Sequence, residues 1–498
     1  MSSNQKVDLQ SGMRFKLMTR RSLLQRTGWV MGAAMLPLRE ALAVGPVSPV
    51  MAKLSLYMSE AGSRALPDEV IEKAKHHILD TLAAMISGSQ LPPGRAALKF
   101  ASAYGGESIS TIAASRILSS PIAAALTNAM LAHSDETDDS HAPSQSHPGC
   151  AVVPATLSLG EKFGVNGIHF LRAVTLGYDI GPRVTMTFGA LDLQMKGHKS
   201  THSIAGVFGA AAATGCAAGL DAQQMRWLLD YSAQQCSGIL AWQRDTDHIE
   251  KAFVFAGMPA RSGATAALLV QSGWTGVDDI FSGPDNFLLA YGLQADPDGL
   301  VEKLGERYEV TRTNIKKWTV GSPIQAALDA MEILRKRHPF EADQVQQVIV
   351  RLATNEAKTV NNREMPDICL QHMMAVMLID KTATFAAAHD KPRMEDPAIL
   401  RQRAKIQLVP DEELQRRLPR REAIVEITLN DGTRLSEHVE AVRGTAENPM
   451  TREEVVAKSR QLMEPVLGAQ TCANLVERVL GLESVKDIRE LRPLLQLR

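Results

Sequence analysis

Apolar residues recur at helical spacing through most of the first 310 residues. The clearest example is 67–87, PDEVIEKAKHHILDTLAAMIS, in which apolar positions from Val70 to Met85 line one face. Pro67 suits the first helical turn and Gly88 suits the end of the helix. The same spacing predicts further helices at 97–104, 120–133, 151–163, 167–188, 203–219, 222–240 and 258–273. Almost no strand pattern interrupts them, so this part of the chain is predicted to be helical.

The pattern changes after about residue 312. Residues 344–353 alternate with β-branched side chains, and 423–440 contains two alternating runs joined by Asn430-Asp431-Gly432, a strong hairpin signal. Two helices, at 323–337 and 369–388, are predicted to accompany these strands. Helical spacing then returns at Thr451, which is followed three residues later by a glutamate and so forms the pattern of a capping box.

The order of these segments predicts a mainly α fold, with a large discontinuous all-helical domain and a smaller inserted α+β lid domain. The predicted boundaries are 50–312 for the first part of the helical domain, 313–447 for the lid, and 448–498 for C-terminal helices that complete the helical domain. A chain of 498 residues is long enough to favour more than one core. Small-residue runs such as GAAAATGCAAGL are expected to let helices pack at close range.

The first 43 residues have the pattern of a targeting segment. TRRSLLQ at 19–25 is a twin-arginine motif, and Ala41-Leu42-Ala43 provides a small-residue cleavage site. The apolar stretch between them is shorter than the roughly 20 residues that cross a bilayer. We therefore expect a twin-arginine signal peptide, cleavage after Ala43, and a periplasmic or secreted protein. No later stretch holds 18 uninterrupted apolar residues, so stable membrane insertion after export is not expected.

Composition excludes some classes of partner. The formal net charge is −1, with 45% hydrophobic and 22% charged residues, so the chain lacks the basic footprint of a nucleic-acid-binding protein. Five scattered cysteines form no close pair, which argues against a disulfide framework or an iron–sulfur cluster. They are expected to be buried small apolar residues.

Residues 132–149, AHSDETDDSHAPSQSHPG, concentrate titratable groups between two apolar segments. A second polar insert, KGHKSTHS at 196–203, comes just before the very apolar helix predicted at 203–219, whose N-terminus would favour an anion. Three interpretations are open: solvated surface loops, a metal site, or a metal-free acid–base site in which carboxylates tune a histidine. The spacing of a known zinc motif is absent, so no metal is assigned.

The run H-S-D-E-T-D-D-S-H-x₅-H-P-G resembles the DFDDTH…HPG segment of the MmgE/PrpD family, which includes 2-methylcitrate dehydratase and cis-aconitate decarboxylase. Further segments resemble the family in the same order: 177–184, 206–221, 251–283 and 447–458. The resemblance implies a large helical domain with an inserted α+β lid, often as a homodimer. It also implies lyase chemistry on small di- or tricarboxylates without a cofactor.

The resemblance implies that several residues of this chain belong to an active site. His147 matches the active-site histidine, Glu136 and Asp139 match the acidic motif, and Ser140 matches its threonine. Lys251 and Lys316 match two family lysines, and Lys199 adds positive charge to the second insert. The chain departs from the family at three positions. Ser200, flanked by His198 and His202, replaces a histidine, Gly321 replaces a lid histidine, and His372 replaces a lid tyrosine.

The function expected from these residues is a dehydratase of the 2-methylcitrate dehydratase type, acting on a small hydroxy-di- or tricarboxylate. Dehydration needs two proton-transfer groups of different pKa, while lysines and helix N-termini hold carboxylates and developing charge. The candidate catalytic residues are His147, Glu136, Asp139, His202, His198 and His372. The candidate substrate-binding residues are Ser140, Lys199, Lys251 and Lys316. A decarboxylase, an isomerase and a non-catalytic periplasmic carboxylate-binding protein remain alternatives.

Overall fold

The computed structural model describes residues 47–292 and 294–497. The predicted signal peptide at 1–43 lies outside the described residues, so export and cleavage after Ala43 stay predictions.

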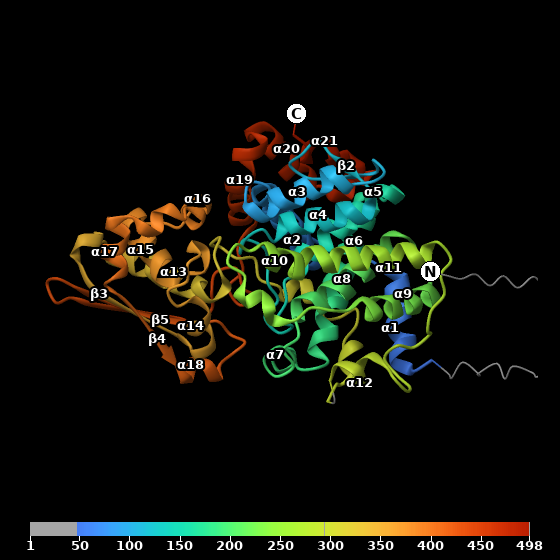
Figure 1. Cartoon of the computed structure of the whole chain (residues 1–498), viewed down its shortest axis with the longest axis horizontal. Coiled ribbons are helices and arrows are strands. Elements are labelled where there is room, and N and C mark those ends of the chain that lie inside the picture. The colour runs from blue at the N-terminus through green and yellow to red at the C-terminus, as the bar shows by residue number, and fades with distance from the viewer. Residues whose placement is uncertain (1–46, 293, 498) are drawn as a thin grey trace, which may run out of the picture. The chain divides into compact units, whose positions relative to one another are not determined.

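Helices build the first part of the described chain, and all the helices predicted there are present (Figure 1). They are α1 (Pro49–Glu60), α2 (Asp68–Gly88), α3 (Pro92–Tyr104), α4 (Pro121–Ala132), α5 (Pro148–Phe163), α6 (Gly167–Met186), α7 (Ala190–Met195), α8 (Thr201–Ala217), α9 (Ala222–Gln235), α10 (Ile249–Ala252), α11 (Met258–Gln271) and α12 (Phe287–Tyr291). A π-helical turn, Phe253–Gly257, joins α10 to α11. Two short strands, β1 (Ser110–Thr111) and β2 (Leu118–Ser119), pair antiparallel.

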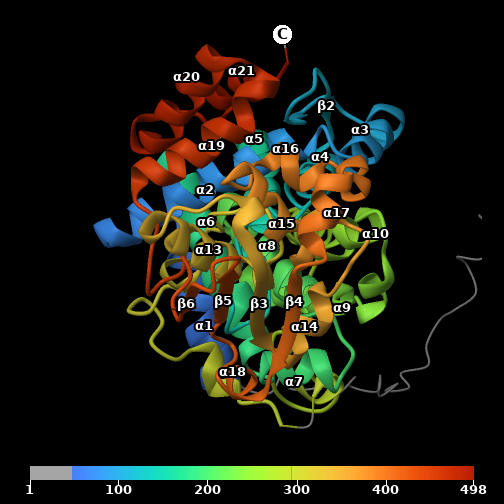
Figure 2. The same ribbon diagram turned by 90° about the vertical axis from the view of Figure 1, so that its left-hand side faces the viewer.

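A four-stranded sheet follows, with strand order β4-β3-β5-β6. Its strands are β3 (Val345–Ala353), β4 (Ile406–Asp411), β5 (Ala423–Leu429) and β6 (Arg434–Val439). The β3–β4 pair is parallel and the other two pairs are antiparallel, with the predicted hairpin between β5 and β6. Helices α13 (Gln325–Arg337), α14 (Thr354–Val360), α15 (Leu370–Asp380), α16 (Phe385–His389), α17 (Pro397–Arg403) and α18 (Glu412–Arg416) surround it. Helices α13 and α15 pack against the sheet, whose strands lie side by side in Figure 2.

Two details of this region differ from the sequence prediction. The single helix expected at 369–388 is two helices, α15 and α16, because Lys381 takes a left-handed backbone with φ of +65° and ends α15. Strand β4 was not predicted. It lies at the sheet edge and contains Pro410, which lacks the backbone donor that a central strand would need.

The C-terminal helices return to the first helices of the chain. They are α19 (Arg452–Leu467), α20 (Ala469–Leu480) and α21 (Arg492–Leu495), and α19 packs against α2. The predicted capping box is present, because the Thr451 side chain accepts from the Glu454 backbone and the Glu454 side chain accepts from Thr451.

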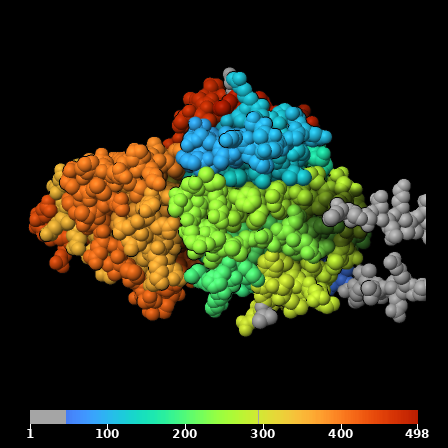
Figure 3. Space-filling view, viewed as in Figure 1, coloured from blue at the N-terminus to red at the C-terminus, as the bar shows by residue number. Residues whose placement is uncertain are grey.

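Buried apolar side chains form two main clusters. One draws on residues from Met51 to Ile315 and again from Met450 to Leu495, and the other on residues from Trp318 to Val442. The segment 318–442, called here the α+β region, forms a lobe beside the helical part (Figure 3). The fold is therefore mainly α with a small sheet, while the domain boundaries at 312/313 and 447/448 stay predictions.

Glycines permit close packing of the long helices α5, α6 and α8. A Cβ on Gly177 would lie 2.7 Å from the backbone oxygen of Gly209 and 2.6 Å from the Val152 side chain. Such distances leave no room for a methyl group, so the two glycines let α6 and α8 approach closely. This confirms the packing role expected of the small-residue run in α8.

All five cysteines are buried and free, as the sequence predicted. Among the described residues, one helical stretch, Ile249–Gln271, is long and apolar enough to cross a membrane. However, 72% of its apolar window is buried inside the protein, which is also the behaviour of a core helix.

Candidate active site

The polar insert is buried. It forms the loop from His133, which ends α4, to His147, which begins α5, and we call residues 133–147 the polar loop. Every side chain from His133 to His141 lies in the interior. The solvated-loop interpretation of this stretch is therefore wrong. Burying ionisable groups is costly unless they are paired, so the partners of each one define its role.

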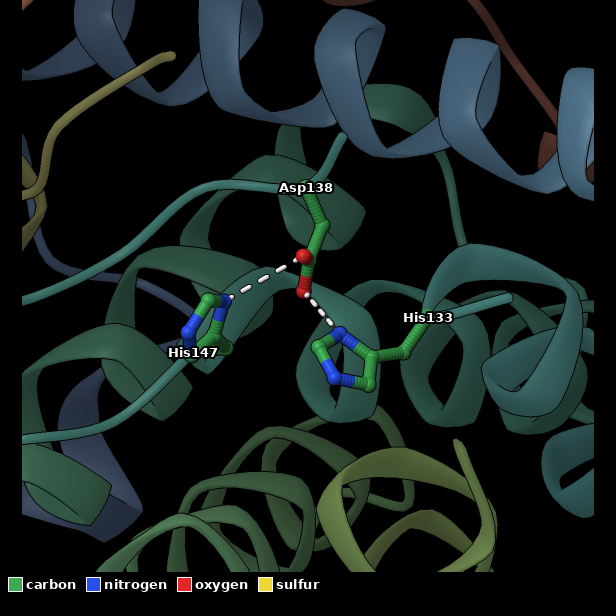
Figure 4. A group of neighbouring side chains, drawn as sticks. All are labelled: His133, Asp138 and His147. Atoms are coloured by element: carbon green, nitrogen blue, oxygen red, sulfur yellow. Dashed lines mark hydrogen bonds and ion pairs between the residues drawn. The ribbon is translucent and has the colours of Figure 1, made fainter. Parts of the chain in front are cut away.

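Asp138 joins two histidines at the centre of the loop (Figure 4). Nδ1 of His133 donates to one carboxylate oxygen over 3.0 Å, and Nδ1 of His147 donates to the other over 3.2 Å. Burial opposes the ionisation of Asp138, but His133 and His147 outweigh it and hold the pKa of Asp138 well below its usual range. Since the ionised carboxylate only accepts, both rings are fixed with Nδ1 as the donor, and the other ring nitrogens point away from Asp138.

His147 has the character of a neutral proton acceptor. Burial lowers its pKa below the usual value, although Asp138 partly opposes that change. With Nδ1 donating to Asp138, the lone pair on Nε2 is free to take a proton. This is the arrangement that a general base near neutral pH requires.

His133, Asp138 and His147 also lie close enough to share a metal ion. Both carboxylate oxygens of Asp138 are already engaged by histidine donors. The Nζ atom of Lys316 lies 3.8 Å from Asp138, and this positive charge disfavours a cation at the same place. The donor set therefore fits hydrogen-bonded acid–base chemistry better than metal binding.

Two lysines converge on Glu136 beside this cluster. The ammonium group of Lys251, in α10, contacts the Glu136 carboxylate. Lys316 Nζ lies 3.5 Å from the same carboxylate and donates to the Glu136 backbone oxygen over 2.8 Å. Burial opposes ionisation of Glu136, but Lys251 and Lys316 hold its pKa well below the usual value. The structure thus brings together the two predicted lysines in a buried position, where ammonium groups suit an anion.

His202 reaches the same cluster from the first turn of α8. Its ring centroid is 5.2 Å from that of His147, and it stacks on Phe255 at 3.7 Å. Phe255 belongs to the π-helical turn and also stacks on His133 at 4.7 Å. Burial and the neighbouring His147 hold the pKa of His202 well below its usual range. Phe255 was not among the predicted site residues, although π-helical turns inside α-helices are common at functional sites.

The α+β region contributes two titratable groups that were not predicted. Nε2 of His389, in α16, lies 3.0 Å from the Asp135 carboxylate of the polar loop. Burial opposes the charged imidazole, but Asp135 raises the pKa of His389 to about 9. Burial raises the pKa of Asp367 to about 7. Nothing in their local sequence distinguishes these two residues from surface groups.

Asp139 and Ser140 make their described hydrogen bonds outside the histidine cluster. Asp139 accepts from His77 Nδ1 over 2.7 Å, from the Tyr178 hydroxyl over 2.5 Å and from the Gly149 backbone over 2.9 Å. Ser140 exchanges backbone hydrogen bonds with Asn314. Both therefore anchor the loop to neighbouring elements, and a direct role in catalysis or binding stays a prediction.

Three other candidate residues, His198, Lys199 and His372, have no described contact with the histidine cluster. His198 is exposed, and Lys199 Nζ donates to the Tyr291 backbone oxygen over 2.8 Å. His372 is fully buried in α15, where the nearest charged groups are Arg403, Arg393 and Asp390. Their proposed roles remain untested predictions.

The three departures from the family pattern have separate structural settings. The Ser200 side chain caps α8 by accepting from the Ser203 backbone. The Gly321 backbone N–H donates to the Asp367 backbone oxygen over 2.9 Å, so the missing lid side chain would have stood near Asp367. His372 occupies the position of the implied tyrosine inside the α+β region.

The chain combines a mainly helical fold with a buried cluster of histidines, carboxylates and lysines. Two family models match it. Residues 52–299 match the model of the MmgE/PrpD N-terminal domain, and residues 318–482 match that of the MmgE/PrpD C-terminal domain. The chain therefore belongs to the MmgE/PrpD family.

Several relatives are similar along nearly their whole length. The chain is 24% identical to a cis-aconitate decarboxylase-like protein of Aspergillus oryzae over 485 residues, which cover 90% of this chain and 98% of that protein. It is 24% identical to cis-aconitate decarboxylase of Aspergillus terreus, covering 90% of this chain and 96% of that protein. The human cis-aconitate decarboxylase is also 24% identical, with 86% of this chain and 91% of that protein covered.

Proposed function

We propose that the chain is a lyase that acts on a small di- or tricarboxylate by histidine acid–base chemistry. The observation that carries the proposal is the neutral His147, oriented by the ionised Asp138, beside the buried ammonium groups of Lys251 and Lys316. This juxtaposition offers a proton acceptor and a carboxylate-binding position in one place.

Decarboxylation of an unsaturated tricarboxylate is the reaction we favour, because the similar proteins above are cis-aconitate decarboxylases or resemble one. In such a reaction the bond from carbon to one carboxylate breaks and carbon dioxide leaves. The electron pair spreads into the conjugated system that ends in a second carboxylate, where Lys251 and Lys316 offset the charge. The Lys251 or Lys316 ammonium, or His147 once its Nε2 has taken a proton from solvent, then delivers that proton to the carbanion.

Dehydration of a hydroxy-tricarboxylate is the second candidate, and it is supported by the neutral His147 beside the two lysines. Neutral His147 would take the proton beside a carboxylate, and a protonated group would donate to the leaving hydroxyl. Both reactions use the same carboxylate-binding lysines, so only the product distinguishes them.

The test is an NMR assay of the purified chain in heavy water with cis-aconitate and with hydroxytricarboxylates such as 2-methylcitrate. We expect either carbon dioxide loss with one solvent deuterium added at carbon, or water loss without such addition. The variant His147→Ala should lose this turnover, and the exposed His338→Ala should retain it. Binding of polycarboxylates without turnover or exchange would favour a non-catalytic binding protein instead.

We further propose export to the periplasm and a homodimer. The twin-arginine motif at 19–25 supports export. Cell fractionation and N-terminal sequencing of the exported chain would test cleavage after Ala43, and light scattering would test the dimer.

A further inference from the structure

His248 lies at the edge of the candidate site and has a strained backbone. It immediately precedes α10 and has a φ of +67°, in the left-handed region that residues other than glycine adopt uncommonly. Two hydrogen bonds hold the loop in this conformation: the Lys251 backbone donates to Asp245 over 2.8 Å, and the Ile249 backbone donates to Asp247 over 3.2 Å. Local strain of this kind persists where the surrounding structure imposes it, often at a ligand site.

The imidazole of His248 is buried without a polar partner. The residue is 4% exposed, and neither ring nitrogen has a hydrogen-bond partner among the described residues. A buried polar group costs free energy unless it is hydrogen-bonded. Burial, with the neighbouring Lys251 and His133, lowers the pKa of His248 to about 3. The ring is therefore neutral near pH 7, with one nitrogen donating and the other accepting.

The His248 ring lies beside the histidine cluster and close in the chain to Lys251. Its centroid lies 5.1 Å from that of His133. Lys251, whose ammonium group contacts Glu136, follows three residues later in the chain. The charged groups that act on His248 are Lys251, His133, Glu136 and Asp135, and they come from α10 and the polar loop.

We propose that His248 is a further substrate-binding residue, which donates a hydrogen bond to a second carboxylate of a ligand whose first carboxylate is held by Lys251. The inference rests on the proposed function. It adds that the site binds polycarboxylates in preference to monocarboxylates. In the free protein, the left-handed backbone and the unpaired buried N–H of His248 both cost free energy. A carboxylate oxygen that accepts a hydrogen bond from this N–H would offset the cost of the unpaired donor.

Calorimetric titration with cis-aconitate tests the inference, with His248→Ala, His248→Asn and His338→Ala compared to the unmodified chain. We expect His248→Ala to weaken binding at least about tenfold, as loss of a hydrogen bond to a charged group does. His248→Asn should stay within about threefold, since asparagine tolerates a left-handed backbone and retains an N–H donor. His338 is exposed, and its replacement should change nothing.

A thermal melt of His248→Gly separates binding from a structural role. Glycine relieves the left-handed strain and removes the unpaired nitrogens, which offsets the packing lost with the ring, so the Tm should stay within about 2 °C of the unmodified chain. A larger fall would assign His248 a structural role and overturn the inference. Unchanged cis-aconitate binding in His248→Ala would overturn it too, while leaving the proposed function intact. An unmodified chain that binds no polycarboxylate would overturn both.

Discussion

Lys458, in α19, donates a hydrogen bond from Nζ to the backbone oxygen of Thr137 over 3.0 Å. The two residues are 321 positions apart in the chain. Thr137 stands between Glu136 and Asp138, so this contact fixes the part of the polar loop that carries both carboxylates. Lys458 also pairs with Asp80 of α2 at 2.6 Å, and both partners are buried. Helix α19 therefore ties the polar loop to α2.

Replacing Lys458 with methionine should destabilise the protein. The change leaves Asp80 buried without a cation and removes the donor to Thr137, and breaking a buried ion pair in this way costs about 3–5 kcal/mol. Urea unfolding at pH 7 measures the loss. Arg460→Met, at an exposed position of the same helix, is the matched control and should change stability little. An unfolding free energy of Lys458→Met equal to the control's would contradict the prediction, and the double variant with Asp80→Asn should recover part of the loss.

Replacing Asp138 with asparagine should reduce turnover far more than it reduces stability. An amide no longer requires Nδ1 of His133 and of His147 to be the donors, so the tautomer that leaves Nε2 of His147 free is lost. We expect kcat on the polycarboxylate substrate to fall by a factor on the order of 10²–10⁴. Asp192→Asn, at an exposed position of α7, controls for the loss of a carboxylate. A kcat within a few-fold of the unmodified chain would show that Asp138 does not orient His147.

His372 should make the folded state sensitive to acid. Burial lowers its pKa to about 4, so the unfolded chain takes up a proton at higher pH than the folded one does. Its contribution to stability is present above pH 6.5 and is lost as the pH falls toward 4, by up to about 3 kcal/mol. Unfolding free energies of His372→Leu at pH 7 and pH 4.5 should therefore differ less than those of the unmodified chain. The exposed His338→Gln should retain the full difference. An unaltered acid dependence in His372→Leu would refute the assignment.

His389 should have the opposite effect at alkaline pH. Although burial opposes its charged form, Asp135 raises the pKa of His389 to about 9, and Asp367 also faces it. The contribution is fully present below pH 6.5 and is lost as the pH rises through 9, by up to about 3 kcal/mol. Unfolding at pH 6 and pH 9.5 measures it, and His389→Gln should reduce the alkaline loss. Asp135→Asn, which removes the other partner, should give the same result. If both variants keep the full alkaline dependence, the pair between α16 and the polar loop does not form.

The sequence by itself determined most of the secondary structure, because that information is local. The helical spacing and terminal residues of 67–87 place α2 correctly, and Thr451 with Glu454 marks the start of α19. The Asn430-Asp431-Gly432 turn identifies the hairpin of β5 and β6. The family resemblance also pointed to His147, Lys251 and Lys316, which the structure brings to one place.

Only the tertiary structure decided which groups of the polar loop face the site. Asp138 and Asp139 are adjacent, yet one joins His133 to His147 and the other anchors His77 and Tyr178. A loop has no helical or strand period, so spacing cannot assign its side chains to a face. Phe255, His248 and His389 come to the site from elements far along the chain. Their positions depend on long-range packing, and no local pattern of residues encodes it.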